Sequence, residues 1–163
     1  MPDNRSRAVI GGSPRRYRFR SDWRVAAPPD AVHRVLERHE DYQRWWPHIR
    51  EVVQTGPDSG RCRFRSVLPV ELCVTVRALR RDPAARVLEL ALGGDLRGRM
   101  LFQVQARGAG ARVRIRQDTE LCRPLLRPLG GLARPLLVAN HALMMRAGRR
   151  GLRAWLEAHL EDG

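Results

Sequence analysis

The sequence has no lysine, few aromatic residues and no long hydrophobic run. A helix that crosses a membrane needs about 20 consecutive apolar residues, so an integral membrane protein is not predicted. Before residue 16 the main apolar stretch is Ala8-Val9-Ile10, which is too short for the core of a signal peptide. We therefore expect neither a membrane span nor a secretion signal.

Cysteine is scarce as well. Cys62, Cys73 and Cys122 are an odd number of residues and lack the spacing of a metal site. They indicate a reducing, cytoplasmic location with no disulfide framework and no metal site. The sequence also lacks a phosphate-binding glycine loop, an HExxH motif and a Gly-x-Ser-x-Gly motif. No cofactor is therefore predicted, and no standard motif identifies an enzyme.

The chain carries a large excess of positive charge. The formal net charge is +14, and all 31 basic residues are arginine. Such a balance suggests nucleic acid or an anionic membrane surface as a partner. Arginine without lysine, alongside abundant alanine, glycine, leucine and proline, is also typical of a GC-rich genome. Because nothing resembles a base-reading module, we favour a solvated arginine surface over specific nucleic-acid binding.

The length of 163 residues fits a single domain. Residues 1–16 lack periodicity and contain Gly11-Gly12-Ser13-Pro14, which predicts a flexible basic tail before a domain at 17–163. Residues 17–25 alternate between apolar and polar, as in a half-buried strand. Pro28-Pro29-Asp30 predicts the start of a short helix. A second short helix, at about 41–46, is predicted to end at Pro47.

The middle of the chain, from residue 48 to 121, is typical of consecutive strands. Apolar residues alternate with polar ones between short turns at 57–60, 82–83, 93–95 and 108–110. This predicts an antiparallel sheet with one dry face. Residues 123–134 are leucine-rich but contain prolines and a glycine pair, so they are either a lid over a hydrophobic opening or a loop whose leucines pack permanently on the sheet edge. From Pro135 the apolar spacing predicts a long helix, so the fold class is α+β.

This order of elements resembles the helix-grip fold of the START-related (SRPBCC) superfamily, which includes birch-pollen-allergen-like and polyketide cyclase/dehydrase-like proteins. The resemblance covers about residues 17–160 and is carried by WRVAAPPDAV at 23–32, YQRWWP at 42–47 and NHALMMRAGRRGLRAWL at 140–156. It implies a curved antiparallel sheet of about seven strands around a long C-terminal helix, with a cavity for a hydrophobic ligand. The activity stays open, because one scaffold hosts many functions.

The inner face of the predicted sheet carries almost no charge. A cavity lined this way suits a small hydrophobic or aromatic molecule oriented by a few hydrogen bonds; the alternative is a filled core. His141 is either a catalytic base, a ligand contact or a structural residue. Arg99 is predicted at the cavity rim, where it would hold a carboxylate or a carbonyl. The full predicted ligand-binding set is Trp45, Trp46, Phe64, Ser66, Val74, Leu90, Arg99, Phe102, Gln117, Thr119, His141, Met144 and Met145.

Three functions remain open at this stage. The first is cyclisation or dehydration of a polyketide-like molecule, promoted by holding a flexible chain in a reactive fold and by neutral hydrogen-bond donors that polarise a carbonyl. The second is a non-catalytic lipid or quinone-type carrier or ligand sensor. The third is docking of an acidic partner, such as an acyl carrier protein, on outward-facing arginines. These are Arg16, Arg18, Arg20, Arg24, Arg61, Arg63, Arg65, Arg77, Arg112, Arg114 and Arg116.

Overall fold

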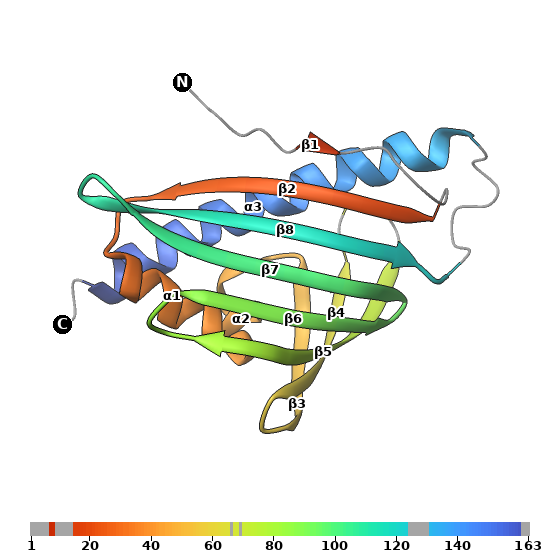
Figure 1. Cartoon of the computed structure of the whole chain (residues 1–163). Coiled ribbons are helices and arrows are strands. Elements are labelled where there is room, and N and C mark those ends of the chain that lie inside the picture. The colour runs from red at the N-terminus through yellow and green to blue at the C-terminus, as the bar shows by residue number, and fades with distance from the viewer. Residues whose placement is uncertain (1–6, 9–14, 66, 69, 124–130, 161–163) are drawn as a thin grey trace.

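A computed structural model describes residues 7–8, 15–65, 67–68, 70–123 and 131–160. One curved antiparallel sheet has the strand order β1-β2-β8-β7-β6-β5-β4-β3 (Figure 1). Strands β3 to β8 form the antiparallel meander that the alternation predicts, and β2 pairs with β8 at one edge of it. The bounds are β1 Arg7–Ala8, β2 Arg16–Val25, β3 Ile49–Gly56, β4 Ser59–Arg65, β5 Glu71–Asp82, β6 Val87–Gly94, β7 Leu96–Arg107 and β8 Gly110–Leu121.

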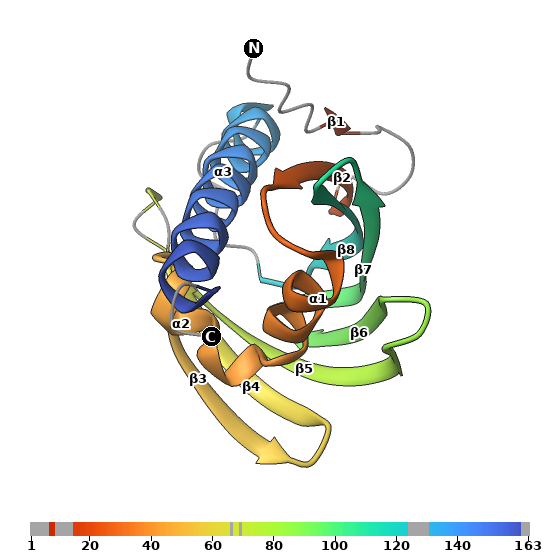
Figure 2. The same ribbon diagram turned by 90° about the vertical axis from the view of Figure 1, so that its left-hand side faces the viewer.

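The helices lie at the positions that the prolines and the spacing of apolar residues predicted. α1 (Pro29–Glu37) begins with a proline in its first turn and an early Asp30, as its sequence predicts. The second predicted helix is a 3-10 turn, η1 (His39–Asp41), that runs into α2 (Tyr42–Trp45). The long helix α3 (Ala133–Leu160) lies across the open side of the curved sheet, and its C-terminal end is next to α1 and α2 (Figure 2). The predicted helix-grip architecture is confirmed.

Alternation along the strands decides which side chains enter the core. In β8, Val113 and Ile115 are buried while Arg114 and Arg116 are exposed, so the predicted inner and outer faces are confirmed. The main core lies between the sheet, α1, α2 and the C-terminal half of α3. Its most completely buried large side chains include Trp23, Phe102, Leu36, Leu88 and Leu152.

α3 is held to α2 by two glycines. A Cβ at Gly148 would overlap the indole of Trp46, and a Cβ at Gly151 would overlap the carbonyl oxygen of Trp45. The Trp46 indole Nε1–H also donates a hydrogen bond of 2.8 Å to the carbonyl of Met144. The C-terminal half of α3 therefore packs directly on the backbone of α2.

The predicted N-terminal tail is only partly described. Within it, Arg7–Ala8 forms a short strand that pairs with Arg20 and Phe19 of β2. β2 begins at Arg16, one residue before the predicted domain boundary. None of the described helices is both long and apolar enough to span a bilayer.

Candidate functional site

A small cavity lies between the inner face of the sheet and the N-terminal half of α3. Its volume is about 70 Å³, and we call it the inner cavity. Strands β2, β4, β5, β7 and β8 supply one wall and α3 the other. No charged side chain is among its described lining residues, which are Tyr17, Phe19, Phe64, Leu72, Leu96, Gln117, Thr119, Leu121, Leu137, Asn140, His141 and Met144.

Three neutral polar side chains form a hydrogen-bonded chain in this apolar wall. Gln117 and Thr119 both face inward from β8, and the Gln117 amide Nε2–H donates to the Thr119 hydroxyl at 3.1 Å. The Gln117 carbonyl Oε1 lies 3.2 Å from Nε2 of His141 on α3. With the amide in this orientation, His141 donates through Nε2–H, and its Nδ1 carries the lone pair. That Nδ1 is buried and has no hydrogen-bond partner among the described residues.

His141 is held in place by stacking as well. Its ring lies parallel to that of Phe19, with 3.6 Å between the centroids and 7° between the planes. Phe19 is opposite Gln117 in the β2–β8 pairing, so one strand pair contacts both the face and the edge of the imidazole. The N-terminal end of α3 also contacts this strand, since the Arg134 guanidinium lies 4.7 Å from the Tyr17 ring centroid.

Burial controls the charge of this histidine. Removal of the ring from water lowers the pKa of His141 from 6.5 to about 4, because the charged form loses hydration and gains no anionic partner. His141 is therefore neutral at pH 7. A neutral imidazole with a free lone pair accepts a hydrogen bond well, but a pKa near 4 makes it a weak base.

The structure brings some of the predicted residues together and separates others. Phe64, Gln117, Thr119, His141 and Met144 line the inner cavity. Six others are buried in the core but are not part of that lining: Trp45, Trp46, Val74, Leu90, Phe102 and Met145. Ser66 lies outside the described residues, as do residues 124–130 of the segment considered as a lid.

Trp45 and Trp46 form an aromatic cluster at the α2 end of the domain. Their rings stack with centroids 5.5 Å apart, and Trp46 also meets Trp23 edge-on at 5.6 Å. Both tryptophans are about 95% buried, with exposed fractions of 4% and 5%. This packing favours a structural role, in which the pair closes one end of the sheet, over the predicted contact with a ligand.

The prediction that Arg99 lies at the cavity rim is wrong. Its side chain is 71% exposed and forms an ion pair of 3.3 Å with Glu89, so it lies on the outer face of the sheet and away from the cavity rim. The reason is the strand period: in β7 the even-numbered residues face inward, including the buried Phe102 and Val104.

Several lining residues were not predicted as site residues, namely Tyr17, Phe19, Leu72, Leu96, Leu121, Leu137 and Asn140. The alternation placed Tyr17, Phe19 and Leu121 on the inner face. It contained no signal for which inner-face residues lie opposite the N-terminal half of α3. That depends on where the helix crosses the sheet.

The outward-facing arginines do share the outer face of the sheet. Some of them, including Arg63 and Arg112, are paired with carboxylates on neighbouring strands. Asp118 contacts Arg16 at 2.7 Å and Arg18 at 3.4 Å. Arg20, however, lies directly opposite Arg116 in the β2–β8 pairing, and like charges in that position repel. The outer face thus combines ion pairs with an excess of positive charge.

No group of histidine, cysteine or acidic side chains in the described part of the chain is arranged to hold a metal ion. Cys62, Cys73 and Cys122 are free thiols, and Cys62 is buried. Burial raises the pKa of Cys62 to about 11, so this thiol is protonated and unreactive at neutral pH.

Comparison with solved structures shows the same fold in several bacterial proteins. The Zhui aromatase/cyclase from Streptomyces sp. R1128 superposes with a TM-score of 0.70 at 19% identity, over 89% of this chain and 96% of that one. A conserved protein from Geobacillus kaustophilus has a TM-score of 0.73 at 8% identity, over 86% and 95% of the two chains. A START superfamily protein from Mycobacterium smegmatis has a TM-score of 0.58 at 18% identity, over 80% and 96%.

At the level of sequence, no curated protein matches this chain. A family does match, the one described as polyketide cyclase/dehydrase and lipid transport, over residues 16–157. That span runs from the first residue of β2 almost to the end of α3 and includes every residue of the inner cavity. The chain therefore belongs to the polyketide cyclase/dehydrase and lipid transport family.

Proposed function

We propose that this protein binds a small hydrophobic or aromatic, polyketide-like molecule in the inner cavity. The observation that carries the proposal is the neutral chain of His141, Gln117 and Thr119 in an otherwise apolar wall. An apolar pocket with a few convergent polar groups is the usual form of a small-molecule site. In this pocket the buried Nδ1 of His141 is ready to accept a hydrogen bond from a ligand hydroxyl.

The cavity must widen to hold such a ligand. Its 70 Å³ is well below the roughly 300–1,000 Å³ of typical ligand sites. α3 is suited to this movement, because its fully buried residues, Met145, Gly148, Leu152 and Leu156, all lie beyond its first three turns. We expect the N-terminal half to move away from the sheet while the half packed on α2 stays in place.

Two finer functions share this site. In a cyclase, the cavity would hold two reacting carbons of one chain close together, and the Gln117 and Thr119 donors would polarise a carbonyl. In a lipid or quinone-type carrier, the same groups would only orient the ligand. The low pKa of His141 and the uncharged lining favour the carrier, because neither supplies a strong base at neutral pH.

The macromolecular partner that we propose for this protein is an acidic protein that docks on the outer face of the sheet. The excess of arginine on the outer face, including the Arg20–Arg116 juxtaposition, would attract an acidic carrier protein with salt-sensitive affinity. We propose a cytoplasmic location, where the three free thiols stay reduced.

A pair of tryptophan variants tests the binding site. Leu137→Trp fills the inner cavity, whereas Leu143→Trp adds the same ring on the outer side of α3, where Leu143 is 44% exposed. We expect the first variant to weaken binding of N-phenyl-1-naphthylamine, a neutral apolar fluorophore, by at least tenfold and the second to leave it unchanged. Equal binding by both variants in a fluorescence titration would contradict the proposal.

Mass spectrometry separates the two finer functions. Native spectra of the protein as purified identify any molecule that it retains. Incubation with a linear poly-β-ketone then shows whether that compound loses water faster with the protein than without it. Faster loss that disappears in Leu137→Trp supports the cyclase, and retention without conversion supports the carrier.

A further inference from the structure

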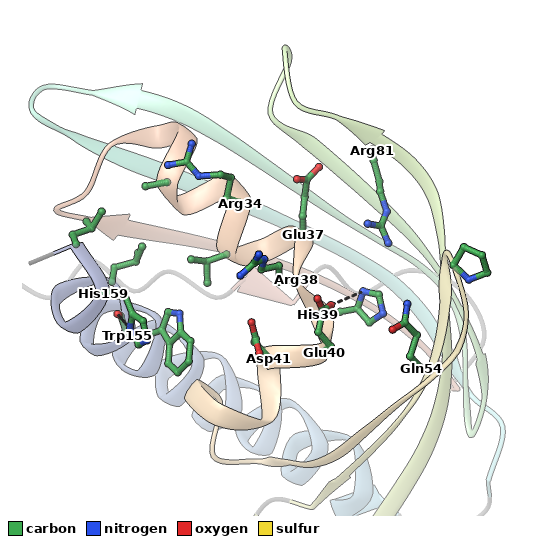
Figure 3. Close-up of a pocket in the computed structure, with 15 residues that line it drawn as sticks. Arg34, Glu37, Arg38, His39, Glu40, Asp41, Gln54, Arg81, Trp155 and His159 are labelled. Carbon is green, nitrogen blue, oxygen red and sulfur yellow. Dashed lines mark hydrogen bonds and ion pairs between the residues drawn. The ribbon is translucent and has the colours of Figure 1, made fainter. Parts of the chain in front are cut away.

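A second and larger pocket lies at the opposite end of α3, and we call it the α1 pocket. Its volume is about 610 Å³, and it opens between α1, η1, the strands β3 and β5 and the last turns of α3 (Figure 3). It shares no described lining residue with the inner cavity. Its lining consists of Ala31, Arg34, Val35, Glu37, Arg38, His39, Glu40, Asp41, Gln54, Pro57, Arg81, Trp155, Leu156, His159 and Leu160.

The carboxylates of this pocket already have basic partners. Each of the three contacts a side chain within four residues of it in the sequence. The contacts are Glu37 with His33 at 3.1 Å, Asp41 with Arg44 at 3.3 Å and Glu40 with His39 at 4.0 Å. Asp41 is therefore paired with a permanent cation, whereas the contacts of Glu37 and Glu40 are ion pairs only when the histidine is protonated.

The arginines of the pocket are less engaged. Arg38 lines the pocket, and its side chain has no ion-pair or hydrogen-bond partner among the residues that the structure describes. Arg81 contacts Asp58 at 3.5 Å through Nε, and the Asp58 side chain is itself 66% exposed. Figure 3 shows Arg81 reaching from β5 toward His39. Guanidinium groups of this kind are suited to a planar carboxylate or a phosphate.

A β-bulge is what brings Arg81 into the pocket. The β5–β6 pairing shifts between Ala78 and Arg80, so that Ala78 is opposite Leu90 and Arg81 is opposite Leu88. Leu88 and Leu90 are both buried on the inner face. Without the extra residue, strand alternation would turn Arg81 to the outer face, as it does Arg77. Bulges that redirect a side chain in this way are frequent beside functional sites.

His39 is a second, independent feature that points to a ligand. Its side chain lines the pocket with only 7% of the residue exposed, and its Nε2 has no hydrogen-bond partner in the described part of the chain. A buried polar nitrogen without a partner is costly. A polar ligand group at the floor of the pocket would satisfy it.

The rest of the lining is apolar. Val35 and the buried Leu156 lie beside Trp155, whose ring stacks on His159 with 4.0 Å between the centroids. We propose that the α1 pocket is a second binding site, for a small organic anion whose carboxylate or phosphate group meets Arg38 and Arg81 and whose apolar or aromatic part lies against Trp155. This site does not depend on the function proposed for the inner cavity.

Titrations followed by ¹H–¹⁵N NMR test the site with benzoate and phenyl phosphate. The indole of Trp155 reports the α1 pocket, and the indole of Trp46, hydrogen-bonded to Met144, reports the side toward the inner cavity. We expect both anions to shift the Trp155 signal saturably and to leave Trp46 in place. Neutral benzamide and cationic benzylamine should bind at least tenfold more weakly. The relative affinities of benzoate and phenyl phosphate identify the preferred anionic group.

Matched variants assign the arginines. The double variant Arg38→Gln/Arg81→Gln should weaken anion binding at least tenfold, whereas Arg77→Gln, an exposed residue of the same strand, should change it less than twofold. Leu137→Trp in the inner cavity should have no effect. Equal binding of benzoate and benzamide, stronger binding of benzylamine, shifts confined to Trp46, or equal losses in the double variant and Arg77→Gln would each overturn the proposal.

Discussion

The buried His141 makes the stability of this protein sensitive to pH above the range in which carboxylates titrate. The folded protein lowers the pKa of this imidazole from 6.5 to about 4, so the unfolded chain binds a proton more readily than the native state. Stability from this group is present in full above pH 6.5. It is lost progressively as the pH falls from there toward 4.

The magnitude follows from the two pKa values. Between pH 7 and pH 5 the native state should lose about 2 kcal/mol through His141 alone. That is a large share of the roughly 5–15 kcal/mol of a typical domain. Asp30, Asp82 and Asp118 have pKa values held below 3.8 by arginine and backbone partners, so their contributions are lost only below that range.

Urea unfolding at pH 7 and pH 5 measures the effect in the wild type and in His141→Gln. The glutamine keeps an N–H donor near Gln117 and does not titrate, so the variant should lose about 2 kcal/mol less on acidification. His48→Gln measures the separate contribution of His48, a residue outside the inner cavity whose pKa burial and Arg50 also lower. Equal losses in the wild type and His141→Gln would refute the burial argument.

Three further predictions concern packing and charge. Ile115→Asp should lower the free energy of unfolding by about 4 kcal/mol or more, because it buries an unpaired carboxylate at a residue that is 2% exposed. The control Arg114→Asp changes an exposed residue and should alter the free energy of unfolding by less than about 1 kcal/mol. Similar losses for the two variants in chemical unfolding would contradict the face assignment. Gly151→Ala should lower the thermal midpoint of unfolding sharply, because its Cβ would overlap the Trp45 carbonyl. Gly131→Ala is the control, because a Cβ at Gly131 meets nothing within 4 Å. An equal shift of the midpoint in both variants would refute the close packing at Gly151. Binding of DNA or RNA should be weak, independent of sequence and abolished by added salt, and a salt-resistant nanomolar site in a binding assay would overturn this prediction.

Local sequence signals determined the elements and their faces. Alternation in residues 17–25 and in the region 48–121 predicted strands with one dry face, and in β2 and β8 the odd-numbered residues form that face. Pro29, Pro47 and the spacing of α3 located the helices. These predictions hold because strand period, proline geometry and helical amphipathicity depend on residues that are close together in the sequence.

The tertiary structure alone decided which inner-face residues form a site. Gln117 and His141 are 24 residues apart and meet at 3.2 Å only because α3 crosses the sheet above β8. Phe102 and Leu90 have the same inward-facing pattern but are buried in the core, on strands that α1 contacts. Arg81 faces inward because of a β-bulge in the β5–β6 pairing. The sequence of β5 contains no signal that predicts this bulge. Crossing position and register are properties of contacts between distant segments, and a single sequence carries no local signal for them.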